Sequence, residues 1–171
     1  MPKITLAEAV KLKSVLSKRI HELEEEMDRL AFFEIEKDSP LPTQKRQFQD
    51  AEKDIDEIRK DFRLLDKLVY RANIDNKIHF NGDSLTIVEA IELATQLRAK
   101  ARKCKQLGSA QKEEFLYMIG ESSSMLRVAA FEPEEYRIKS LENERHANRL
   151  SNLINSKNYT IELEFDQDKY F

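Results

Sequence analysis

The sequence contains no tryptophan, one cysteine, three glycines and four prolines. A single cysteine cannot form an intramolecular disulfide, which excludes a small secreted fold held by disulfides. So few glycines and prolines argue against a sheet protein rich in turns, and three scattered glycines cannot form a phosphate-binding loop. No stretch approaches the ~18 consecutive apolar residues of a membrane-spanning helix. The first ten residues have no apolar run behind their lysine, so we expect no signal peptide and a cytoplasmic protein.

Charge of both signs is abundant instead. The 171 residues include 29 Lys and Arg against 32 Asp and Glu, and the formal net charge is -3. The length suits one domain with a substantial core, and 36% charged with 40% hydrophobic residues is typical of long amphipathic helices. Proteins that mainly bind nucleic acid are usually basic overall, so this composition makes that class unlikely.

The first half predicts two long helices. Thr5 and Glu8 form a capping box, and apolar residues then recur at spacings of three and four, with Lys13 as the one polar break. This first helix should run for about 28 residues and be closed by the segment around Pro40 and Pro42. A short loop then implies an antiparallel hairpin with a second helix. That helix has an unbroken apolar stripe: Phe48, Ala51, Ile55, Ile58, Phe62, Leu65, Val69 and Ala72.

A second capping box starts a third helix in the middle of the chain. Residues 74–80 alternate between apolar and polar, which predicts a short strand, and Asn81-Gly82 is a turn dipeptide. Thr86 and Glu89 then form the cap of a helix that should stop near Gly108. Its apolar stripe consists of Ile87, Ala90, Ala94, Leu97, Ala101 and Cys104, where a free cysteine usually acts as a small core residue.

The last third is less regular. Residues 115–120 are apolar but few, and residues 125–131 fit either a strand or the lead-in to a helix; we favour the strand. Pro133 followed by Glu134 predicts the start of a fourth helix, which should end near residue 156. Residues 159–165 alternate strictly and predict a half-buried strand.

The two halves of the chain resemble each other. The sequence TLAEAVKL from Thr5 matches TIVEAIEL from Thr86, and residues 73–80 match residues 158–165. We predict a single helical domain over residues 1–171 with an internal repeat of 5–80 and 86–165, although convergence of common caps is the alternative. The expected fold is mainly α: antiparallel coiled-coil helix hairpins form a four-helix bundle, and strands 74–80 and 159–165 form a small β-sheet at one end.

Caps and strands recur along the chain in one pattern, which is made by Asn73, Ile78, Gly82, Leu85, Thr86, Glu89, Ala90, Arg127, Val128, Asn158, Tyr159 and Thr160. This pattern resembles the septicolysin-like family of small bacterial proteins. The resemblance covers nearly the whole chain and departs around residues 115–133. It implies a helical fold without active-site residues, and the family has no established biochemical function, although its name implies a cytolysin.

The histidines do not predict a metal centre. A di-metal site in a helical bundle needs Glu-x-x-His motifs, and none of His21, His79 and His146 has a glutamate three residues before it. We instead expect His21 and His146 to be surface residues that pair with Glu25 and Glu142. The sequence therefore predicts no metal, no cofactor and no enzyme activity.

A basic run on the third helix is the one feature that suggests a ligand. Arg98, Arg102 and Lys105 share a helix face and are candidates for contacting phosphates, whereas Lys100 and Lys103 point elsewhere. A solvated or ion-paired face is the alternative.

These observations favour a non-enzymatic helical structural or interaction protein. The unbroken apolar stripe and the edges of short strands suit self-association, so we expect a homo-oligomer. A nucleic-acid-associated helical arm is one alternative. A cytolysin-like membrane-active protein, as the family name implies, is the other.

Overall fold

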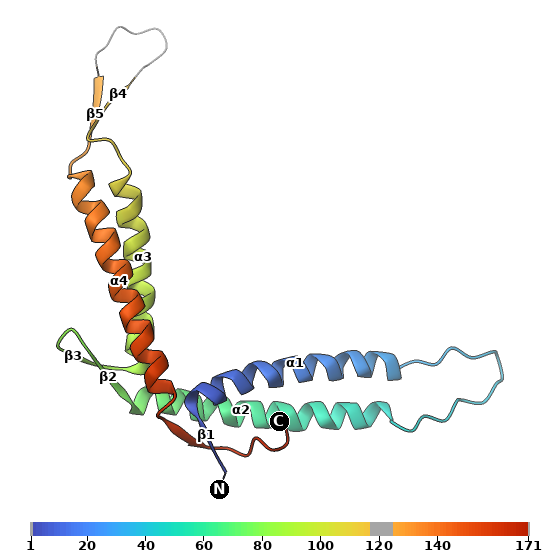
Figure 1. Ribbon diagram of the computed structural model, residues 1–171. Coiled ribbons are helices and arrows are strands. Elements are labelled where there is room, and N and C mark those ends of the chain that lie inside the picture. The colour runs from blue at the N-terminus through green and yellow to red at the C-terminus, as the bar shows by residue number, and fades with distance from the viewer. Residues whose placement is uncertain (1, 117–124, 171) are drawn as a thin grey trace. The chain divides into compact units, whose positions relative to one another are not determined.

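The computed structural model describes residues 2–116 and 125–170 (Figure 1). It confirms a mainly helical protein built from helix hairpins and small two-stranded sheets. The chain divides into two compact units, and we describe each by itself. Unit 1 comprises Met1–Asp75 and Lys157–Phe171, and unit 2 comprises Asn76–Ser156.

Unit 1 is built on helices α1 (Leu6–Leu30) and α2 (Phe48–Asp75), which run antiparallel (Figure 1). The predicted capping box is confirmed, because the Thr5 hydroxyl accepts from the Glu8 amide at 3.2 Å and the Glu8 carboxylate accepts from the Thr5 amide at 2.7 Å. Helix α1 has 25 residues, slightly fewer than expected, and the connection of residues 31–47 joins it to α2.

The core of unit 1 consists mainly of large aliphatic side chains from both helices. The predicted stripe of α1 needs one correction, because Leu12 is fully buried and Lys13 lies beside the stripe, where it pairs with Asp66. A helix with 3.6 residues per turn drifts from a strict seven-residue repeat, which explains this shift. The buried residues are Leu6, Ala9, Leu12, Leu16 and Leu23 of α1, and Ala51, Ile55, Ile58, Leu65, Val69 and Ala72 of α2.

Two strands from opposite ends of the chain complete unit 1. Strand β1 (Lys3–Thr5) pairs antiparallel with β6 (Glu162–Glu164), with Ile4 opposite Leu163. The alternation predicted for residues 159–165 is confirmed, because Ile161, Leu163 and Phe165 are buried. The predicted pairing of this strand with residues 74–80 is wrong.

Residues 74–80 form a local hairpin in place of the predicted sheet. Strand β2 (Lys77–Phe80) pairs with β3 (Asp83–Thr86) across Asn81-Gly82, whose φ angles of 48° and 86° suit a type I′ turn. A two-residue turn closes at little entropic cost, so β2 pairs with the adjacent strand β3 and not with a strand far away in the sequence. Ile74, predicted in the strand, is instead a residue of α2 with 60% of its surface exposed.

Unit 2 continues with helices α3 (Ile87–Gly108) and α4 (Pro133–Asn158), which lie side by side (Figure 1). The capping box of Thr86 and Glu89 is confirmed. The contact between the two helices is close: the Ser140 hydroxyl donates to the Ala101 carbonyl at 3.0 Å. Most of the buried residues are small, namely Ala, Cys or Ser. The full set consists of Ile87, Ala90, Ala94, Ala101 and Cys104 of α3, and Ser140, Ala147, Leu150 and Ile154 of α4.

A second hairpin lies between α3 and α4. Strand β4 (Glu113–Leu116) pairs antiparallel with β5 (Met125–Val128), so the strand favoured for residues 125–131 is confirmed over 125–128. Residues 117–120 of the predicted apolar segment lie outside the described residues.

The internal repeat stays a prediction. Both halves share the order strand, capped helix, connection, helix, strand, but the described connection of residues 31–47 contains no counterpart of β4 and β5. In the part of the chain that the structure describes, no helix is long and apolar enough to cross a membrane.

Candidate interaction surfaces

The three predicted phosphate-contacting residues are all exposed on α3. The Arg98 guanidinium donates to the Ser151 hydroxyl at 2.5 Å. Among the described residues, no carboxylate forms an ion pair with Arg98, Arg102 or Lys105. The alternative to phosphate contact was a basic face that is either solvated or ion-paired. The lack of described carboxylate partners fits a solvated face better than an ion-paired one. Lys103 lies near the Gln106 side chain at 3.5 Å, away from this set.

These cations continue an exposed row that begins at the first turn of α3. Val88, Ile91 and Thr95 precede them at the same alternating spacing of three and four, and Val88 and Ile91 are 45% and 46% exposed. One face of α3 is therefore apolar at its beginning and basic at its end. We name this row the α3 stripe: Val88, Ile91, Thr95, Arg98, Arg102 and Lys105.

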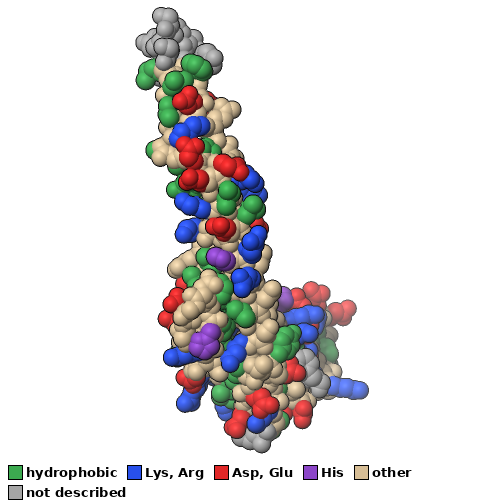
Figure 2. Space-filling view, turned by 60° about the vertical axis from the view of Figure 1, so that its left-hand side comes forward, with side chains coloured by type: hydrophobic (Ala, Val, Ile, Leu, Met, Phe, Trp, Pro, Cys, Tyr) green, Lys and Arg blue, Asp and Glu red, His purple; other side chains and the backbone are tan. Residues whose placement is uncertain are grey.

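Hairpin β4–β5 exposes apolar side chains on both of its faces. Phe115, Leu126 and Val128 share one face, because Phe115 is opposite Leu126 and alternate residues of a strand point the same way. Leu116 and Met125 share the other face. All five are between 40% and 60% exposed, and Figure 2 shows hydrophobic side chains gathered at this end of unit 2.

The hydrogen-bond pattern of this hairpin leaves an open edge. The Ala129 amide donates to the Lys112 carbonyl at 2.8 Å, which makes these two residues a hydrogen-bonded pair. Such pairs alternate along an antiparallel ladder, so the N–H groups of Leu126 and Val128 point outward from β5. The Lys112 ammonium donates to the carbonyls of Ala129 and Phe131 at 3.0 Å and thereby fixes the base of the hairpin.

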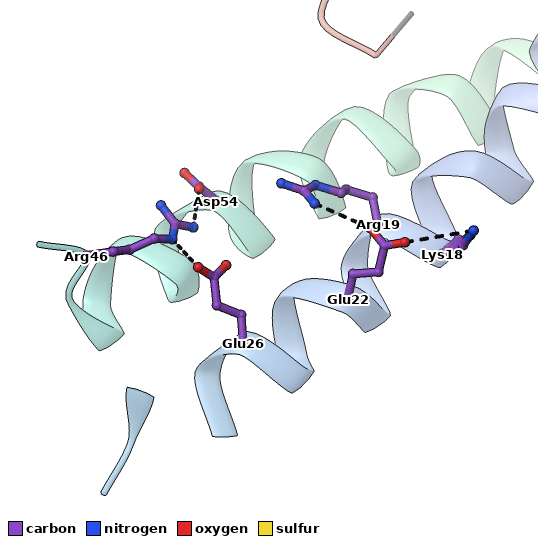
Figure 3. A network of polar contacts seen from close by, with 6 residues as sticks. All are labelled: Lys18, Arg19, Glu22, Glu26, Arg46 and Asp54. Carbon is purple, nitrogen blue, oxygen red and sulfur yellow. Dashed lines mark hydrogen bonds and ion pairs between the residues drawn. The ribbon is translucent and has the colours of Figure 1, made fainter. Parts of the chain in front are cut away.

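Polar side chains join α1 to α2 in unit 1. Figure 3 shows the Arg46 guanidinium between two carboxylates, with Nε donating to Glu26 at 2.6 Å and Nη2 to Asp54 at 2.7 Å. These hydrogen bonds, first to Asp54 and then to Glu26, raise the pKa of Arg46. Arg59 pairs with Glu24 at 2.7 Å. The network connects the two helices.

A hollow of about 440 Å³ lies beside this network. The Tyr170 hydroxyl donates to Asp61 at 2.6 Å, and burial raises the pKa of Tyr170. Lys169 pairs with the same carboxylate at 3.2 Å, and Glu22 contacts both Lys18 and Arg19. Glu22 is thus the one carboxylate that faces three cations in the lining of this hollow, which consists of Val15, Lys18, Arg19, Glu22, Ile58, Lys169 and Tyr170.

The histidines behave in two different ways. His21 lies 3.4 Å from Glu25, as predicted. The prediction for His146 is wrong: its ring lies edge-on to Phe80 with the ring centroids 6.3 Å apart, and no ion pair with Glu142 is found between these described residues. His146 therefore lies beside the β2–β3 hairpin. Within residues 2–116 and 125–170, no three or more His, Cys, Asp or Glu side chains are grouped to hold a metal ion.

Sequence reasoning missed the apolar hairpin. Its signal was present as two adjacent apolar pairs, Phe115-Leu116 and Met125-Leu126, because adjacent apolar residues in a strand face opposite sides. A strand covered on one side only would alternate, as residues 159–165 do.

Comparison with known proteins identifies a protein of similar fold but no known activity. No protein-family model matches the chain, and no curated protein matches it. A crystal structure of a functionally unknown conserved protein from Corynebacterium diphtheriae is similar, with a TM-score of 0.65 and 17% sequence identity. The match covers 95% of this chain and 100% of that chain. At this identity the similarity establishes a shared fold alone.

Proposed function

We propose that this is a non-enzymatic interaction protein that self-associates into a homo-oligomer through hairpin β4–β5. The observation that carries the proposal is the exposure of Phe115, Leu116, Met125, Leu126 and Val128 on an isolated two-stranded sheet. Such a sheet is only marginally stable in water unless its faces or edges are covered. Exposed apolar clusters of this kind mark interaction sites.

The charges of the hairpin favour its β5 edge for the contact with a second copy. Strand β4 carries Glu113 and Glu114, so two β4 edges side by side would place like charges next to each other. Strand β5 has a single charged residue, Arg127, among its four residues. Pairing of β5 edges also closes a symmetric dimer.

The experiment is a measurement of molecular mass by light scattering at micromolar concentration. The wild type should exceed the monomer mass of 20.1 kDa. The double variant Leu126→Thr/Val128→Thr should shift towards the monomer, because threonine keeps the strand propensity but removes apolar surface. The control is Ile138→Gln/Leu141→Gln, which removes two similarly exposed apolar residues from α4 and should leave the mass unchanged. A monomeric wild type would contradict the proposal.

A nucleic-acid-associated helical arm is the second candidate. It is favoured by the lack of described carboxylate partners for Arg98, Arg102 and Lys105. Binding through phosphates releases counterions, so affinity for RNA or DNA should fall steeply between low and moderate salt. Affinity that is insensitive to salt would argue against this role. The septicolysin-like resemblance and the cytolytic activity implied by that name stay predictions.

A further inference from the structure

The α3 stripe offers a second surface, separate from hairpin β4–β5. Its first residues, Val88 and Ile91, leave apolar area exposed, and its last residues, Arg102 and Lys105, leave two cations without a described carboxylate partner. A helix that covered this face would need apolar residues at one end and acidic residues at the other.

Helix α1 carries a row of that kind. Val10 is 48% exposed, and Ser14, Ser17, His21, Glu24 and Asp28 follow it at the same alternating spacing of three and four. This row, which we name the α1 stripe, begins apolar and ends acidic. The Glu24 side chain remains 46% exposed although it pairs with Arg59.

We infer that the α3 stripe of one copy docks along the α1 stripe of a second copy, with the two helices parallel. In that orientation Val10 meets Val88, and Arg102 and Lys105 lie beside Glu24 and Asp28, because Glu24 follows Val10 by the same number of residues as Arg102 follows Val88. The antiparallel orientation would place Asp28 against the apolar end and Val10 against the cations. The apolar ends supply the buried area, and the charges select the partner and its direction.

Other helices fit the α3 stripe less well. Two parallel α3 stripes would align cations with cations, and two antiparallel ones would set apolar residues against cations. Helix α2 also carries exposed acidic residues, but its row Glu52, Asp56, Arg59 and Arg63 has basic residues where an apolar end would be needed. The inference rests on the proposed self-association, because it names a second surface for it.

Charge reversal tests this docking in the full-length chain. In sedimentation velocity, Arg102→Glu/Lys105→Glu should weaken self-association at least roughly tenfold, because acidic groups would then face acidic groups. The matched control is Lys100→Glu/Lys103→Glu, which makes the same change of charge on other faces of α3 and should have little effect. If both variants associate like the wild type, the inference is overturned.

Complementation tests the direction and the partner. The variant Glu24→Lys/Asp28→Lys should also weaken self-association, and mixing it with Arg102→Glu/Lys105→Glu should restore the wild-type strength of assembly through the reversed charges. Restoration in the mixture would also show that both variants are folded. If the mixture does not assemble although the wild type does, the docking is wrong.

The two proposals fail in different ways. A monomeric wild type overturns both. An assembly that Leu126→Thr/Val128→Thr disrupts and that the α3 charge reversal leaves intact overturns only the docking of α3 on α1.

Discussion

The two helix hairpins of this protein are packed with different side chains. In unit 1 the contact between α1 and α2 contains large aliphatic residues, such as Leu16 and Leu65, which are fully buried. In unit 2 the buried residues of α3 and α4 include Ala94, Ala101 and Ala147. Small residues allow helices to approach closely but remove less apolar area from water. The large apolar residues of α3 and α4 that remain exposed are Val88, Ile91, Ile138, Leu141 and Leu153.

The polar contacts differ in the same direction. Carboxylate pairs with Arg46, Arg59 and Lys13 join the two helices of unit 1 or their connection. In the described part of unit 2, no ion pair joins α3 to α4, and the hydrogen bonds between these helices involve the hydroxyls of Ser140 and Ser151. The helices of unit 1 are therefore joined by ion pairs, whereas those of unit 2 are joined by hydrogen bonds of serine hydroxyls.

The largest expected effect is in the aliphatic core of unit 1. Leu16→Ala should lower the free energy of unfolding by about 2–5 kcal/mol, because it leaves a cavity at a fully buried position. Denaturant unfolding gives the size of the loss, and amide hydrogen exchange should locate it in α1 and α2. A loss below about 1 kcal/mol would mean that this contact can collapse around the missing atoms.

The next effect concerns close approach in unit 2. An added Cβ at Gly108 would lie 2.7 Å from the Arg137 backbone nitrogen, so the helices must separate. Gly108→Ala should lower the free energy of unfolding by about 1–3 kcal/mol, although alanine is the better helix former. Thermal unfolding measures this loss. We also expect hydrogen exchange to increase at the end of α3 and at the beginning of α4, where Gly108 and Arg137 lie. A more stable variant would show that the helices are not in tight contact there.

Caps should contribute equally in the two units, since both boxes have the same geometry. Thr5→Ala and Thr86→Ala should each cost about 1 kcal/mol. Hydrogen exchange in the first turns of α1 and α3 measures each loss separately. Clearly unequal losses would show that packing around the cap, and not the cap itself, sets the cost.

The smallest effect is a dependence on pH. The amide and hydroxyl of Thr5 lower the pKa of Glu8, and those of Thr86 lower the pKa of Glu89. A lowered pKa stabilises the folded state above the ordinary value of 4.5, and this contribution is lost as pH falls through the folded-state pKa. Glu8→Gln and Glu89→Gln should therefore reduce the loss of melting temperature between pH 5 and about pH 3. An unchanged acid profile in both variants would contradict the assigned cause.

The helices and their caps were predictable from the sequence, because caps and apolar spacing are local signals. The partners of the strands were not. Strand β6 pairs with β1 from the other end of the chain. Strand β3, the local partner of β2, contains the polar residues Asp83 and Ser84 and therefore does not have the apolar pattern of a strand. Pairing depends on which edges the folded helices bring together, which no local pattern encodes.

The candidate surfaces show the same division. The shared face of Arg98, Arg102 and Lys105 followed from helical spacing. Its apolar beginning did not, because Val88 and Ile91 lie directly beside the buried residues Ile87 and Ala90 in the sequence. Only the structure separates the apolar residues of α3 that are buried from those that stay exposed.

Hydrogen exchange of strand β5 tests the central claim of self-association most directly. The outward amides of Leu126 and Val128 should exchange slowly in concentrated protein and rapidly after dilution below the dissociation constant, because a second copy covers them only in the assembly. Exchange of these two amides that is fast and independent of concentration, in protein that light scattering shows to be assembled, would contradict the assignment of the β5 edge.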